Sequence, residues 1–152
     1  MTHIKRIMID HKKCIGCRNC YIACMHAHSS NNNNSIYTLD LTNNVNESRN
    51  SVKTDDTGAY FPLICRHCDD PECVSTCMSG AMTKNAENGL VLYNKEQCAS
   101  CFMCVMNCPF GILKPDDKTK TFVIKCDFCI HDENGPNCVR ACHAKTIYVK
   151  EV

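Results

Sequence analysis

The stretch CASCFMCVMNCP, residues 98–109, sets four cysteines and a proline at the spacing C-x2-C-x2-C-x3-C-P. The same cysteine spacing occurs 84 positions earlier, in CIGCRNCYIAC (14–24). Two further stretches carry wider versions of it, CRHCDDPECVSTC (65–77) and CDFCIHDENGPNCVRAC (126–142). Together they contain all 16 cysteines of the 152-residue chain. The sequence is therefore an internal repeat of four cysteine groups with irregular distances between them.

Four cysteines define each group. Group one is Cys14, Cys17, Cys20 and Cys24, and group two is Cys65, Cys68, Cys73 and Cys77. Group three is Cys98, Cys101, Cys104 and Cys108, and group four is Cys126, Cys129, Cys138 and Cys142.

The N-terminal residues bear on whether these cysteines form disulfides or bind metal. The segment MTHIKRIMIDHKKC (1–14) is charged throughout and has neither the apolar stretch nor the cleavage site of a signal peptide. We therefore expect a cytoplasmic protein, whose thiols stay reduced and serve as metal ligands. No apolar run reaches the eighteen residues or so of a membrane helix, so we expect no membrane span.

The spacing separates zinc from iron–sulfur clusters. A structural zinc site takes two C-x2-C pairs a dozen or more residues apart. Groups one and three instead place three cysteines within seven residues, and a fourth follows four positions on. In two-cluster ferredoxins the first three cysteines of such a run bind one 4Fe-4S cluster and the fourth binds the other. The sequence thus predicts four 4Fe-4S clusters.

Groups two and three lie close enough in the chain to exchange their fourth cysteines, which leaves groups one and four to exchange theirs. Clusters C and D would be held by Cys65, Cys68, Cys73 and Cys108, and by Cys98, Cys101, Cys104 and Cys77. Clusters A and B would be held by Cys14, Cys17, Cys20 and Cys142, and by Cys126, Cys129, Cys138 and Cys24. Spacing alone also allows other pairings, such as group one with group two.

Short β-branched or apolar runs between the groups predict strands at 4–9, 60–64, 89–93, 121–125 and 146–150. The last step of each group predicts the start of a short helix. We expect an α+β fold of two ferredoxin-like, two-cluster halves, with small antiparallel sheets. The outer half would comprise 1–28 and 109–152, and the inner half 65–108. Residues 29–57 are rich in Asn and Ser and predict a long, solvated insertion, with docking of a partner or covering of a cluster as the alternative.

Cluster binding would supply stability and charge. Outside the cysteines the apolar content is modest and Trp is absent, so we expect the apoprotein to be largely unfolded. The net charge of +1 gives no reason to expect nucleic-acid binding. Four oxidised clusters with their thiolates would change it to about −7 and favour docking on basic partner surfaces.

The order of the four motifs resembles the four-cluster electron-transfer subunits that serve molybdenum reductases, formate dehydrogenases, hydrogenases and carbon monoxide dehydrogenases. The stretches CRHCDDPECV (65–74), CPFGI (108–112) and KCDFC (125–129) support the resemblance, which spans nearly the whole chain apart from the polar segment. It implies two ferredoxin-like halves, the nested exchange of fourth cysteines and one-electron transfer along a row of clusters.

CMSGAM (77–82) looks most like the iron–sulfur subunit of anaerobic carbon monoxide dehydrogenase. That resemblance implies a carbon monoxide dehydrogenase as partner and a hydrogenase, ferredoxin or NAD(P) oxidoreductase as acceptor, within a hetero-complex. The alternative partner is a formate dehydrogenase, hydrogenase or aldehyde oxidoreductase. The chain departs from the family at Met25, Met78 and His143, where the family often has proline after the fourth cysteine.

Other function classes have less support. No glycine pattern approaches G-x-G-x-x-G, so we expect no flavin or nicotinamide site on this chain. All sixteen cysteines are assigned to clusters, which leaves no open cluster corner for catalysis, and we expect an electron carrier without a catalytic site. An iron or redox sensor would normally carry a DNA-binding motif, and none is visible. We expect His67 to pack in the interior or face solvent, and His28 to lie on the surface.

Overall fold

The computed structural model describes residues 4–29, 37, 39–40 and 47–152. Its helices and strands are β1 (Lys5–Ile9), α1 (Asn19–Ala27), β2 (Ser51–Thr54), β3 (Tyr60–Leu63), α2 (Glu72–Ser75), β4 (Met82–Lys84), β5 (Val91–Tyr93), α3 (Met103–Asn107), β6 (Lys114–Pro115), β7 (Val123–Ile124), α4 (Asn137–Arg140) and β8 (Ile147–Glu151). Two 3-10 turns, η1 (His11–Lys13) and η4 (Lys95–Gln97), lead into groups one and three.

Each sheet is a pair of antiparallel strands, namely β1–β8, β2–β3, β4–β5 and β6–β7. The predicted α+β class, with small antiparallel sheets and short helices, is confirmed. The five predicted strands correspond to β1, β3, β5, β7 and β8, and each cysteine group runs into a helix. Strands β2, β4 and β6 were not predicted. No helix in the described part of the chain combines the length and hydrophobicity that a bilayer crossing needs.

Two of the sheets are copies of one unit. Met82 pairs with Tyr93 between β4 and β5, and Ile147 pairs with Ile9 between β8 and β1. Tyr93 follows Ile9 by 84 positions, the offset between groups three and one. Ile147 follows Met82 by 65 positions, the offset between the last two cysteines of groups four and two. The strand before one group therefore pairs, in the same register, with the strand after its partner group.

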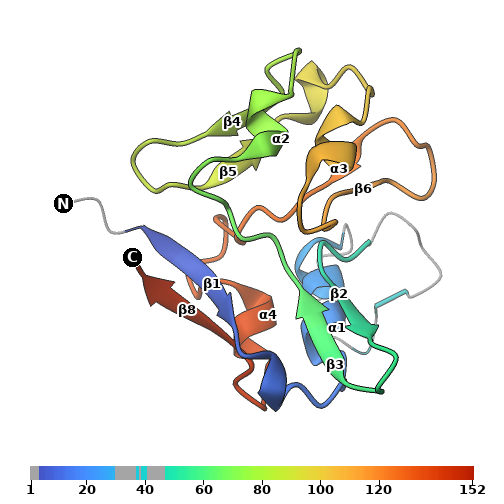
Figure 1. Ribbon diagram of the computed structural model, residues 1–152, viewed down its shortest axis with the longest axis vertical. Coiled ribbons are helices and arrows are strands. Elements are labelled where there is room, and N and C mark those ends of the chain that lie inside the picture. The colour runs from blue at the N-terminus through green and yellow to red at the C-terminus, as the bar shows by residue number, and fades with distance from the viewer. Residues whose placement is uncertain (1–3, 30–36, 38, 41–46) are drawn as a thin grey trace.

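These units form two assemblies (Figure 1). Strands β4 and β5 lie with α2 and α3, while β1 and β8 lie with α1, α4 and the hairpin of β2 and β3. Each assembly has an apolar core that includes cysteines. The first core contains Met82, Cys104, Leu113 and Val123. The second contains Ile7, Cys20, Ile64, Cys138 and Ile147.

The hairpin of β6 and β7 packs on the inner half, although the predicted division of the chain placed it in the outer half. The sequence placed 109–152 in the outer half, yet Leu113 and Val123 pack with Met82 and Cys104 of the inner half. The reason is physical: residues 65–108 contribute only Met82 and Cys104 as buried members of this core, and the hairpin covers them. The proposed inner half therefore extends beyond residue 108, as far as the hairpin.

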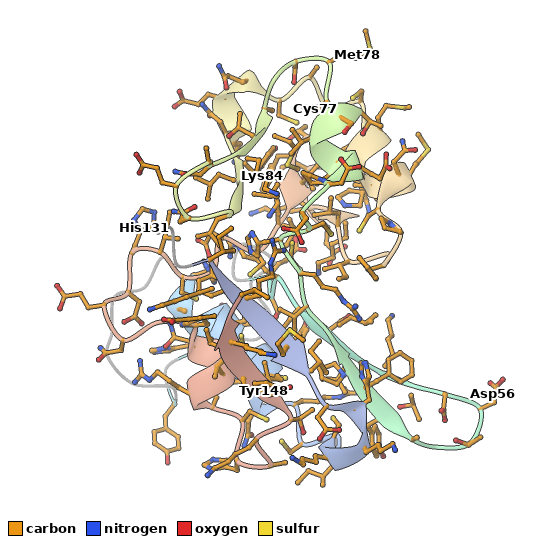
Figure 2. All side chains as sticks on the ribbon, turned by 60° about the vertical axis from the view of Figure 1, so that its left-hand side comes forward. Asp56, Cys77, Met78, Lys84, His131 and Tyr148 are labelled. Atoms are coloured by element: carbon orange, nitrogen blue, oxygen red, sulfur yellow. The ribbon has the colours of Figure 1, made fainter. Side chains whose placement is uncertain are left out.

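The polar segment 29–57 differs from its prediction at its C-terminal end. Residues 30–36, 38 and 41–46, about half of the segment, lie outside the described residues, and the expectation of a solvated insertion is not tested there. The end of the segment is ordered, since β2 pairs with β3. The turn of this hairpin projects from the molecule, with Asp56 near its tip (Figure 2).

The residues just before β2 are buried despite their polarity. Ser48 is 0% exposed and Asn50 is 6% exposed. The Asn50 amide donates to the carbonyl of Cys20 at 3.0 Å, and Glu47 accepts from the N–H of Asp117 at 2.6 Å. Composition concealed this burial, because buried polar groups are stable wherever they find hydrogen-bond partners.

Candidate metal centres

A left-handed bend recurs within the first C-x2-C step of every group. The residue before the second cysteine has a positive φ in each, namely Gly16 (72°), His67 (46°), Ser100 (55°) and Phe128 (61°). Only glycine adopts this conformation without steric cost, so three of the four loops carry strain at a functional position. Successive N–H groups in such bends form concavities that bind anions, including iron–sulfur sites. The four loops are thus alike in backbone as well as in sequence.

Set A consists of Cys14, Cys17, Cys20 and Cys142, which line one cavity. Three come from the group-one loop, and Cys142 follows α4. Burial raises the pKa of Cys20 to about 11, and the charges of the other three thiols act in the same direction. The structure therefore brings together the four thiols that the nested exchange assigns to cluster A.

Set B consists of Cys24, Cys126, Cys129 and Cys138, which line a second cavity. Burial raises the pKa of Cys138 to about 12, and the charges of Cys24, Cys129 and Cys20 add to this effect. Because Cys20 belongs to set A, sets A and B are neighbours.

Set C consists of Cys65, Cys68, Cys73 and Cys108, which line a third cavity. Burial raises the pKa of Cys73 to about 11, and Cys65 and Cys108 act in the same direction. Burial also raises the pKa of Cys126 in set B, and the largest further contribution comes from Cys65. Sets B and C are thus neighbours across the two halves.

Set D consists of Cys98, Cys101, Cys104 and Cys77. Burial raises the pKa of Cys104, and the charges of the other three thiols also raise it. Cys104 in turn raises the pKa of Cys73 in set C. The four sets therefore follow one another in the order A, B, C, D.

The two outermost sets reach the surface. Of the sixteen cysteines, all of which are described, only Cys17 in set A and Cys101 in set D are exposed. They occupy equivalent positions, 84 residues apart. Next to set D, Met78 follows Cys77 at one end of the molecule (Figure 2) and is 97% exposed. Sets B and C contain no exposed cysteine.

Hydrogen bonds to sulfur accompany these sets. The N–H groups of Arg49, Met82, Ser100 and Phe128 donate to the Sγ atoms of Cys24, Cys77, Cys98 and Cys126 at 3.3–3.4 Å. Such bonds stabilise thiolate over thiol, and around an iron–sulfur cluster they contribute to its potential.

The donor set fits 4Fe-4S clusters. None of the sixteen thiols is in a disulfide, and they gather in four sets of four. Burial, and after it the charges of neighbouring cysteines, raise the pKa values of Cys20, Cys73 and Cys138, so thiolates at these positions need a cationic centre. The anion-binding bends and the N–H donors to sulfur are also suited to a cluster with its thiolates. Sixteen cysteines in these motifs correspond to four 4Fe-4S clusters.

His28 lies beside set B, and its predicted surface position is wrong. Its side chain is 12% exposed. Its Nδ1 donates to the carbonyl of Cys24 at 2.8 Å, and its Nε2 donates to the carboxylate of Asp127 at 3.1 Å. Burial would lower the pKa of His28, but the hydrogen bonds to Asp127 and Cys24 raise it to about 10. This ion pair ties the end of α1 to the group-four loop.

Lys125 is a second residue that the sequence did not single out. It is 5% exposed, and its Nζ donates to Cys65 Sγ at 3.5 Å. Its charge opposes the effect of burial on the pKa values of Cys73 and Cys126, which belong to different sets. The available signal was a charged residue at the end of the apolar run TFVIK (121–125).

His67 packs in the interior, one of the two roles expected from the sequence. It is 2% exposed, and its Nδ1 accepts from the N–H of Val91 at 3.0 Å. Its ring meets that of Phe128 edge to face at 5.7 Å. Burial and the charge of Lys125 lower the pKa of His67 to about 3, so its ring is neutral.

Comparisons with known proteins agree with these centres. Residues 56–152, which include groups two, three and four, match the 4Fe-4S dicluster domain family. The putative electron transport protein YsaA of Escherichia coli (strain K12) is 31% identical, over 96% of this chain and 89% of its own. Electron transport protein HydN of the same strain is also 31% identical, over 90% and 82%. Formate hydrogenlyase subunit 2, again from this strain, is 28% identical, over 94% and 80%.

A solved structure shows a related fold. A chain of the active site complex BamBC of benzoyl coenzyme A reductase, bound to benzoyl-CoA, superposes with a TM-score of 0.52. It is 26% identical, and the match covers 98% of this chain and 80% of that chain. With its four cysteine sets, small antiparallel sheets and these relatives, the chain belongs to the 4Fe-4S dicluster domain family.

Proposed function

We propose that this chain is an electron-transfer protein that carries electrons between two redox partners by way of four 4Fe-4S clusters. The single observation that carries this proposal is the order of the cysteine sets, with A and D exposed at the ends and B and C covered between them. When bound, each cluster supplies a site that gains and loses one electron.

The proposed ligands are the four sets as the structure gathers them. In each set, three thiols come from one loop and the fourth comes from the partner group. Support comes from the three cavities lined by complete sets and from the electrostatic influence of the other set D thiols on Cys104. A pairing of group one with group two has no such support, because Cys142 of group four lines the cavity of Cys14, Cys17 and Cys20.

Side chains of this chain shield sets B and C from water and leave set D accessible at the surface. Around sets B and C, Ile64, His67 and Val91 are at most 2% exposed. At set D, Met78 follows Cys77 and Met106 lies two residues after Cys104, and both side chains are exposed. Apolar side chains around an exposed ligand suit a docked partner, whose contact would exclude water.

We propose a formate- or hydrogen-linked enzyme as the partner. The support is the similarity to formate hydrogenlyase subunit 2, over 94% of this chain. The sequence pattern CMSGAM favoured a carbon monoxide dehydrogenase, but none of the relatives named above is a subunit of one. A cytoplasmic hetero-complex, in which the partner performs the catalysis, agrees with relatives described as electron transport proteins.

The test is anaerobic purification of the tagged chain from its own host, with mass spectrometry of whatever remains bound. A formate dehydrogenase or hydrogenase that also reduces the chain with formate or hydrogen would support the proposal. A carbon monoxide dehydrogenase would restore the partner favoured by the sequence. A chain that binds its clusters but accepts electrons from none of these enzymes would contradict the proposed partner class.

A further inference from the structure

Lys125 lies at the junction of the two middle sets. It directly precedes Cys126 of set B, and its ammonium donates to Cys65 Sγ of set C at 3.5 Å. It also donates to the carbonyls of Val91 and Cys126, at 2.6 and 2.9 Å. An ammonium group has three N–H donors, and these three acceptors use all of them. The charge is therefore fixed in place between set B and set C.

The internal repeat allows the position of Lys125 to be compared with its equivalent in another cysteine group. Lys125 precedes the first cysteine of group four, and Ile64 precedes the first cysteine of group two. Both are buried, at 5% and 1% exposure, and Ile64 belongs to the apolar core that also contains Ile7 and Ile147. An apolar side chain thus serves this position in one copy of the unit. Burying an ammonium group is far more costly than burying a hydrocarbon, so the charge itself calls for an explanation.

Among the described residues, no carboxylate forms an ion pair with this charge. The Nζ of Lys125 instead contacts Cys65 Sγ of set C, and Cys126 of set B is the next residue along the chain. A buried cation is poorly screened by salt, so its effect on those sets is strong.

We propose that Lys125 is a positioning residue that raises the reduction potentials of the two middle clusters, those of sets B and C. This inference rests on the proposed function, because it requires Cys65 and Cys126 to be cluster ligands. A cluster that accepts one electron from a partner gains one negative charge. A fixed cation stabilises that reduced form more than the oxidised form, and therefore favours reduction.

The test is Lys125→Met, which removes the charge and keeps an unbranched side chain that is one atom shorter. Potentials are measured by anaerobic redox titration followed by electron paramagnetic resonance, and iron and sulfide are counted in the same samples. We expect full cluster content and about a tenfold shift toward the oxidised form for two of the four clusters, or about 59 mV for a one-electron couple. Lys125→Arg, which keeps the charge, should retain most of the original potentials.

Lys84→Met is the matched control. Lys84 lies at the end of β4 (Figure 2) and donates to the carbonyl of Cys68 at 3.2 Å, but its side chain is 28% exposed. Solvent screens such a charge, so we expect less than about a twofold shift in any cluster.

The outcomes separate this inference from the proposed function. An unaltered protein without four clusters would refute the proposed function. Unchanged potentials in a fully loaded Lys125→Met variant would refute the role of Lys125 alone. If Lys125→Met loses iron while Lys125→Arg keeps four clusters and the original potentials, the charge is required and the inference stands. Loss of iron from both variants would identify Lys125 as a merely structural residue and overturn the inference.

Discussion

One cysteine from a distant part of the chain completes each set of four thiols. Cys142 joins a loop that ends more than a hundred residues earlier, and Cys24 joins the group-four loop in return. In the proposed assignment, each fourth cysteine is both a ligand and a cross-link between segments. Single-residue changes can therefore test the connections directly.

The nested exchange predicts which pairs of substitutions overlap. Cys142→Ser should lose one cluster, about four irons. Adding Cys14→Ser should cause little further loss, because both residues belong to set A. Adding Cys65→Ser instead should remove a second cluster, of set C. Iron analysis of the two double variants checks this, and equal iron content in both would contradict the assignment.

The ion pair of His28 and Asp127 predicts a loss of stability in Asp127→Asn. Hydrogen bonds to charged groups contribute about 1.5–3 kcal/mol, or roughly 3–12 °C in Tm for a chain of this size. The matched control is Asp132→Asn, because Asp132 meets the half-exposed Arg140 at 3.7 Å, and such pairs contribute about 0–1 kcal/mol. Thermal denaturation of the cluster-loaded proteins measures both. Equal Tm changes would show that the His28 contact has no special weight.

The helices and sheets are too short to be stable alone, and the loops between them determine their places. An isolated two-stranded hairpin is marginal in water. In this chain the 3-10 turns, the left-handed bends and the strand registers repeat with the cysteine groups. The cysteine spacing therefore determines where the helices and strands lie in the chain.

Gly16 marks a place where a loop and a strand meet closely. A Cβ added there would lie 2.6 Å from the ring of Tyr60 on β3, and the positive φ adds strain. Gly58→Ala is the matched control, since its φ is also positive but nothing lies within 4 Å. We expect about 1–2 kcal/mol of destabilisation from φ alone at Gly58 and more at Gly16. Denaturation curves check this, and an equal effect at both positions would contradict the packing of Tyr60.

The sequence predicted the elements that follow from a simple pattern. Alternating or β-branched runs gave β1, β3, β5, β7 and β8, and the cysteine groups gave the helices. It missed β2, which lies in a segment whose polar composition resembles a loop. It also missed the packing of the β6–β7 hairpin on the inner half, because Leu113 and Val123 make contacts that no local pattern encodes.

The candidate site shows the same division. Spacing indicated the proposed ligands, since cluster motifs are local. The neighbours of those ligands, His28 and Lys125, depend on contacts between chain segments far apart in sequence. His28 follows group one directly yet meets Asp127, 99 positions later. Lys125 stands out because Ile64, at the equivalent position before group two, is apolar.

At the scale of the whole molecule, we expect both apolar cores to depend on the bound iron–sulfur clusters. Cysteines are part of both buried clusters of apolar residues, so each core surrounds thiol sets. Sixteen thiolates without metal would repel one another, and metal binding in such proteins is coupled to folding. The fold and the cofactors should therefore be lost together.

Removal of iron under anaerobic conditions predicts this loss. Treatment with a chelator and an oxidant should abolish most of the circular dichroism signal of the sheets and helices, and reconstitution with iron, sulfide and thiol should restore it. Thiol alone is the control and should restore little. A fully folded apoprotein would show that the polypeptide cores suffice.

The central claim is that sixteen cysteines hold four 4Fe-4S clusters, and metal analysis tests it most directly. Protein purified without air, quantified by amino-acid analysis, should contain about sixteen irons and an equal number of acid-labile sulfides per chain. About eight irons, or zinc without sulfide, would contradict the account.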